Sequence, residues 1–125
     1  MSEIKEYFLL KQDENTITIS GEVVASIAAS AAVEVDNVTG MAAAPQLPAE
    51  NAEFFIHKNN IKGVRAIWVA EDTCRLELYV MVKLGAAVKD VASAIQDKVK
   101  YAVESATGLN VQAVDVYVAG ISLKK

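Results

Sequence analysis

The sequence predicts a two-layer α+β sandwich, in which a mostly antiparallel sheet of four or five strands carries two amphipathic helices on one face. Three features predict this fold: short runs of alternating β-branched residues, two longer segments with apolar residues every three or four positions, and one hairpin between them. The predicted order is strand, helix, strand, hairpin, helix, strand. We expect a single domain over residues 16–121, after a polar lead-in of 1–15 and before a basic tail of 122–125.

The first strand and helix follow directly from the residue pattern. Thr16 to Ile19 alternates and is β-branched, which favours a strand, and Ser20 stands where a helix N-cap is expected. The helix ends at Asp36-Asn37, and a short strand follows at Val38 to Ala43. Three- and four-residue spacing predicts an apolar stripe along this helix, formed by Val23, Val24, Ile27, Ala28, Ala31, Ala32 and Val35.

The hairpin comprises Val64 to Ala70 and Arg75 to Lys83, joined across Glu71-Asp72-Thr73. Strict alternation in its second strand separates two sets of side chains onto opposite faces. One face carries Leu76, Leu78, Val80 and Val82, whereas the other carries Arg75, Glu77, Tyr79, Met81 and Lys83. This strand ends at Gly85.

The second helix spans about Val88 to Ala106, with Gly108 placed to close it in a left-handed conformation. The last strand spans Val111 to Ala119. By contrast, residues 44–62 resist interpretation, because Pro45 and Pro48 interrupt regular structure there. The helix stripe comprises Val88, Val91, Ala92, Ile95, Val99, Ala102, Val103 and Ala106.

With both helices on one face, the other face of the sheet should meet water. Its predicted residues mix aliphatic and aromatic side chains with charges, as a protein–protein surface does. Two alternatives remain: Val64, Ala66 and Trp68 point outward instead, or residues 44–62 fold over this face. The side chains predicted to contact a partner are Arg65, Ile67, Val69, Tyr79, Met81 and Tyr117.

Composition narrows the function classes. Hydrophobic residues make up 53% and charged residues 22% of the chain, which excludes a disordered protein. A net charge of −4 disfavours nucleic acid as a partner. The apolar run Tyr7 to Leu10 is too short for a signal peptide, and no stretch approaches a membrane span. We therefore expect a cytoplasmic protein without direct membrane insertion.

Catalytic chemistry has little support. One Cys and one His exclude a Cys/His zinc site or a disulfide within a single chain, so we expect no metal. His57 lies in a polar loop, and Cys74 beside Arg75 is expected to be a buried structural thiol rather than a nucleophile. Glu71 and Asp72 diverge at a turn. No glycine-rich phosphate loop occurs, so we expect neither a cofactor nor enzymatic activity.

Several motifs resemble, in order and spacing, the alkaline-shock-protein family of Gram-positive bacteria, also called the envelope stress response family. The resemblance covers about Thr16 to Ile121, and only residues 42–51 depart from the family's shorter, Gly-richer link. The matching segments are Ile17 to Ala28, Val33 to Met41, Lys62 to Val64, Ile95 to Val99, Val103 to Leu109 and Val114 to Ile121.

The resemblance implies a non-enzymatic protein of cell-envelope and alkaline stress homeostasis, held near the membrane by a membrane-anchored protein partner in some members. We therefore expect a scaffold that forms homo-oligomers or binds a partner through its sheet. Two rival hypotheses are a small carrier of an acyl or lipid ligand, with a cavity between the two layers, and an enzyme or accessory subunit of a lipid-metabolism complex.

Overall fold

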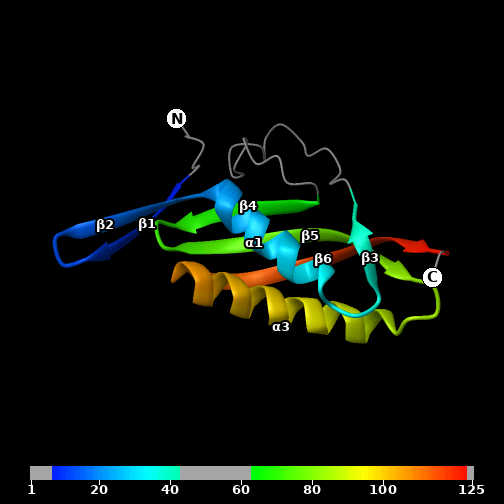
Figure 1. The fold of residues 1–125 in the computed structure, drawn as a ribbon. Helices are drawn as coiled ribbons and strands as arrows, with labels where there is room; N and C mark the ends of the chain where they lie inside the picture. The colour runs from blue at the N-terminus through cyan, green and yellow to red at the C-terminus, as the bar shows by residue number, and fades with distance from the viewer. Residues whose placement is uncertain (1–6, 43–62, 124–125) are drawn as a thin grey trace.

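The computed structural model describes residues 7–42 and 63–123, and these form two layers (Figure 1). In chain order the elements are β1 (Tyr7–Gln12), β2 (Asn15–Ser20), α1 (Gly21–Val33), β3 (Val38–Met41), β4 (Val64–Ala70), β5 (Thr73–Lys83), α3 (Val88–Thr107) and β6 (Asn110–Ser122).

The main sheet is organised around β5, its longest internal strand. Both β4 and β3 pair with β5 antiparallel, whereas β6 pairs with it in parallel along its whole length. This parallel pair was not anticipated, although it follows from the predicted order, because the chain runs back along α3 before it enters β6. The predicted α+β class is confirmed.

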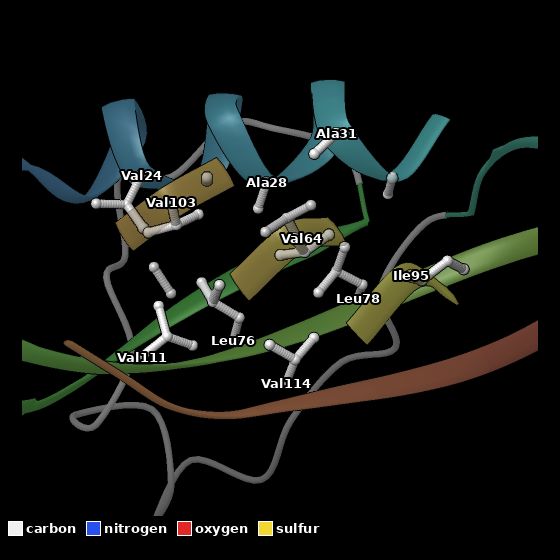
Figure 2. Packing of buried hydrophobic residues seen from close by; sticks show 14 of the residues in the cluster. Val24, Ala28, Ala31, Val64, Leu76, Leu78, Ile95, Val103, Val111 and Val114 are labelled. Atoms are coloured by element: carbon white, nitrogen blue, oxygen red, sulfur yellow. The ribbon is translucent and has the colours of Figure 1, made fainter. Parts of the chain in front are cut away.

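Both helices cover the same face of this sheet, as predicted (Figure 1). Figure 2 shows Val24 and Ala28 of α1, Ile95 of α3, and Leu76 and Leu78 of β5 lying between the helices and the strands. All five side chains are completely buried. Alanine at the α1 positions brings this helix close to the sheet, so that the two layers share one hydrophobic core.

The ends of both helices follow the predicted signals. The Ser20 hydroxyl accepts a hydrogen bond of 3.0 Å from the Glu22 backbone N–H and caps α1. Gly108 closes α3 with φ of 81°, a left-handed conformation that glycine adopts at low cost. Local chemistry therefore sets where each helix ends.

The N-terminal segment differs from the expected polar lead-in. Tyr7–Gln12 forms β1, which pairs antiparallel with β2, and Phe8 lies opposite Ile19 with its side chain fully buried. The apolar run Tyr7 to Leu10, followed by a polar turn and an alternating strand, is a hairpin signature that predicts this pairing. The predicted segment 44–62, including Pro45, Pro48 and His57, lies outside the described residues.

Candidate interaction surface

The face of the sheet opposite the helices, which we call the outer face, displays the side chains predicted to contact a partner. In β4, Val64 and Ala66 are buried on the helix side, so Arg65 and Ile67 point to the outer face. The alternative in which Val64, Ala66 and Trp68 point outward is wrong, because Trp68 packs against the core.

Strand register brings charged and aromatic residues together across the three strands. Arg65 of β4 lies opposite Glu77 of β5, which lies opposite Asp115 of β6. Two residues farther along β5 and β6, on the same face, Tyr79 lies opposite Tyr117. Residues far apart in sequence therefore form neighbouring rows on the outer face.

The outer face contains a stacked tyrosine pair. The rings of Tyr79 and Tyr117 lie 4.7 Å apart between centroids and are inclined by only 9°. The Arg65 guanidinium lies 5.6 Å from the Tyr79 ring centroid, within the range of a cation–π interaction. These contacts hold the aromatic side chains in one arrangement before any partner binds.

The two tyrosines are exposed to different extents. Tyr79 is 6% exposed, whereas Tyr117 is 44% exposed. Tyr79 was predicted as a contact residue, but it is buried by its neighbours and offers little surface of its own. Its role in this arrangement is to support Tyr117, which presents its ring at the surface.

Charged side chains flank the aromatic pair. Arg75 Nη2 forms an ion pair of 2.9 Å with Asp115 Oδ2, and its Nη1 donates to Gln112 Oε1 at 3.3 Å. The Tyr79 hydroxyl donates to Glu77 Oε1 at 3.4 Å. Burial raises the pKa of Glu77, and Asp115 adds to that effect while Arg65 opposes it. The flank is thus a network of paired charges.

Aliphatic side chains complete the outer face. Met81 lies against Gly120, where an added Cβ would stand 2.9 Å from the Met81 Cε atom. A register shift in the β5–β6 pairing places Gly120 opposite Met81, a detail that side-chain alternation alone does not predict. Val69, at the far end of β4, is 36% exposed. Together with Ile67, these residues give the face an apolar component.

Cys74 points to the opposite side of β5 and is completely buried. Burial raises its pKa to about 12, and the nearby Glu104 carboxylate acts in the same direction. A thiol in this state is a poor nucleophile at neutral pH, so the prediction of a structural cysteine is confirmed.

The described part of the chain has neither a metal-binding cluster nor a membrane-spanning helix. Residues 7–42 and 63–123 contain no cluster of three or more His, Cys, Asp or Glu that is arranged to hold a metal ion. Within the same ranges, no helix has the length and apolar character needed to cross a bilayer.

Residues 10–123 match the sequence model of the alkaline-shock-protein family. This family is described as having a cell envelope-related function. The chain belongs to the alkaline-shock-protein family. This result confirms the resemblance drawn from the sequence motifs, and it connects the protein with the cell envelope.

Relatives of similar length support the assignment. The uncharacterized protein YloU of Bacillus subtilis (strain 168) is 34% identical over 112 residues, which cover 90% of this chain and 92% of YloU. The uncharacterized protein YqhY of the same strain is 30% identical over 123 residues, which cover 94% of this chain and 89% of YqhY. The copper form of MamM CTD shares the fold, with a TM-score of 0.50 and 17% identity over 83% of this chain and 89% of that one.

Proposed function

We propose that this member of the alkaline-shock-protein family is a non-enzymatic scaffold of the cell envelope that works in the cytoplasm and reaches the membrane through a protein partner. It binds that partner, or further copies of itself, through the outer face of the sheet. The observation that supports this proposal is the stacked Tyr79–Tyr117 pair, flanked by paired charges.

Side chains that are already held in their bound arrangement lower the entropic cost of binding. Binding energy at protein interfaces concentrates in a few aromatic and arginine side chains surrounded by a polar rim. Tyr117 is already stacked, and Arg75 is already paired with Asp115, so neither loses much conformational freedom on binding. The residues proposed as partner contacts are Arg65, Ile67, Val69, Met81 and Tyr117, and Tyr79 supports the Tyr117 ring by stacking on it.

Self-association is tested by size-exclusion chromatography with light scattering between pH 7 and 9.5. We expect a mass above the 13.4 kDa of one chain, and Tyr117→Ala should lower it. The control is Tyr7→Ala, which removes an exposed tyrosine from β1. A mass that the two substitutions lower equally would count against the outer face.

Partner binding is tested by affinity capture from a Bacillus subtilis lysate with wild type, Tyr117→Ala and Tyr7→Ala as parallel baits. Proteins bound through the outer face should be retained by wild type and Tyr7→Ala and lost from Tyr117→Ala. If the wild-type chain is monomeric and all three baits retain the same proteins, the proposed function is refuted.

The carrier hypothesis gains no support from the described layers. It requires an apolar cavity between helices and sheet, whereas Leu76, Leu78, Ile95 and Val103 meet there in one completely buried cluster. The hollow formed by described residues of α1 and α3 opens instead on the outer side of the helices.

A further inference from the structure

The side of α1 that faces away from the sheet lacks the charges of an ordinary exposed helix. Glu22 is the single charged residue of α1, and Val23 and Val33 are 47% and 46% exposed. The neighbouring helix α3 has a strongly charged exposed side, which includes Lys89, Asp90, Asp97, Lys98 and Lys100. The exposed positions of α1 after Glu22 are Val23, Ser26, Ser30 and Val33, so this side carries small or apolar groups without charge, as a binding surface does.

A groove of about 570 Å³ runs between α1 and α3 on this side of the molecule. Its walls include the small residues Ser26 and Ser30 of α1 and Ala102 and Ser105 of α3. Tyr101 stands at the rim and is 74% exposed. Because small side chains leave the space between the two helices open, a row of larger side chains from a third helix can pack into it.

The groove has an acidic end. Glu34 and Lys98 form an ion pair of 3.2 Å and line both the groove and an adjoining hollow of about 390 Å³. Asp36 and Asp90 also line that hollow, so three carboxylates face a single lysine there. This excess of negative charge favours a cationic group at this end.

We propose that this groove binds an amphipathic helix of a protein partner, with the apolar side of that helix between α1 and α3 and its Lys or Arg residues over the acidic end. The surface lies on the opposite side of the molecule from the outer face, so it adds a second partner site to the proposed function. A fatty acid fits less well, because its carboxylate would meet Glu34, Asp36 and Asp90. A second copy would bring the same excess of acidic charge.

The occupant is tested by selecting helical peptides of about 18 residues from a displayed library on the full chain. All members carry an apolar side, and the charges at their two ends are randomised. We expect the enriched peptides to carry Lys or Arg at one end only and to bind more weakly as salt increases. Enrichment without a basic end, or no enrichment at all, would overturn the proposal.

Filling the groove tests the location of the site. The double substitution Ser30→Gln with Ser105→Gln adds volume at two exposed positions of the groove and suits helical backbone, so we expect an intact fold. Peptide affinity should fall by about tenfold or more. The matched control is Ser93→Gln, at an exposed position of α3 that lines neither hollow, and affinity should not change.

The acidic end is tested separately. Asp36→Asn should weaken the selected basic peptide several-fold and reduce its salt dependence, whereas Asp97→Asn, on exposed α3 surface outside both hollows, should do neither. Equal effects of the two substitutions would contradict the proposed orientation. If a fatty acid displaces the peptide, the occupant of the groove is a lipid and not a partner helix. If only the groove-filling variant lowers the mass of the protein in solution, the occupant is a second copy of the chain. Tyr117→Ala should leave peptide binding unchanged, so failure of the outer face and failure of the groove are distinguishable.

Discussion

Alternate residues of β5 form two surfaces, and different kinds of interaction stabilise each of them. The inner side consists of Leu76, Leu78, Val80 and Val82, all completely buried beneath the helices. The outer side carries Met81 together with Arg75, Glu77 and Tyr79, which interact with their neighbours through an ion pair, a hydrogen bond and a stacked ring. The inner side therefore depends on volume and packing, whereas the outer side depends on which specific groups meet.

The largest difference between the two sides should appear on truncation. Leu78→Ala removes a completely buried side chain and should lower the free energy of unfolding by about 2–5 kcal/mol, because it leaves a cavity in the core. Met81→Ala, three residues along on the outer side, should cost roughly 1 kcal/mol or less. Urea unfolding followed by circular dichroism measures both. Equal losses would show that the outer side is also core.

Alkaline pH should weaken the inner side through Cys74. Its pKa is raised from 9.0 to about 12 by burial, so its contribution to stability is complete below about pH 9 and is lost as pH rises toward 12. At about pH 10.5 the loss should reach roughly 2 kcal/mol, at about 1.4 kcal/mol per pH unit.

The Cys74→Ala variant is the control for this prediction, because it retains every other titrating group. The stability difference between wild type and Cys74→Ala should shift in favour of the variant between about pH 9 and pH 10.5. A difference that stays constant with pH would show that the thiol ionises in the folded chain as it does in the unfolded one.

The outer side should respond to pH through Glu77, with a smaller effect because this side chain is only half-buried. Its pKa is raised from 4.5, so its stabilising contribution is present below that value and decreases as the carboxyl ionises in the folded state. Glu77→Gln should therefore gain stability relative to wild type between pH 4 and pH 7, measured by urea unfolding at each pH. A relative loss would mean that Arg65 outweighs burial.

The smallest effect should come from the Arg75–Asp115 ion pair. Both side chains are more than a third exposed, so water and salt screen their attraction despite the 2.9 Å contact. A double-mutant cycle with Arg75→Ala and Asp115→Ala should give a coupling energy below about 1 kcal/mol. A much larger coupling would show that the outer side is stabilised by charge as strongly as the inner side is by packing.

Local sequence was enough to predict most elements and the two sides of β5. Alternation in Arg75 to Lys83 separated inner from outer residues, and Ser20 and Gly108 marked the ends of helices, because these signals depend on neighbours in the chain. In β4 the same alternation grouped Arg65 with Ile67 but left open which side they face, and the burial of Val64 and Ala66 decided it. The helical stripe was less accurate for Val23, which is largely exposed although its hydrophobicity suggested otherwise.

Tertiary structure decided the contacts that define the candidate sites. Strand register set the stacking of Tyr79 on Tyr117, and with it the burial of Tyr79, because pairing between β5 and β6 involves residues 38 positions apart. A register shift placed Gly120 under Met81, and the packing of α1 beside α3 created the groove with its acidic end. Periodicity reports which side a residue faces, whereas only the folded chain determines which distant residue it meets.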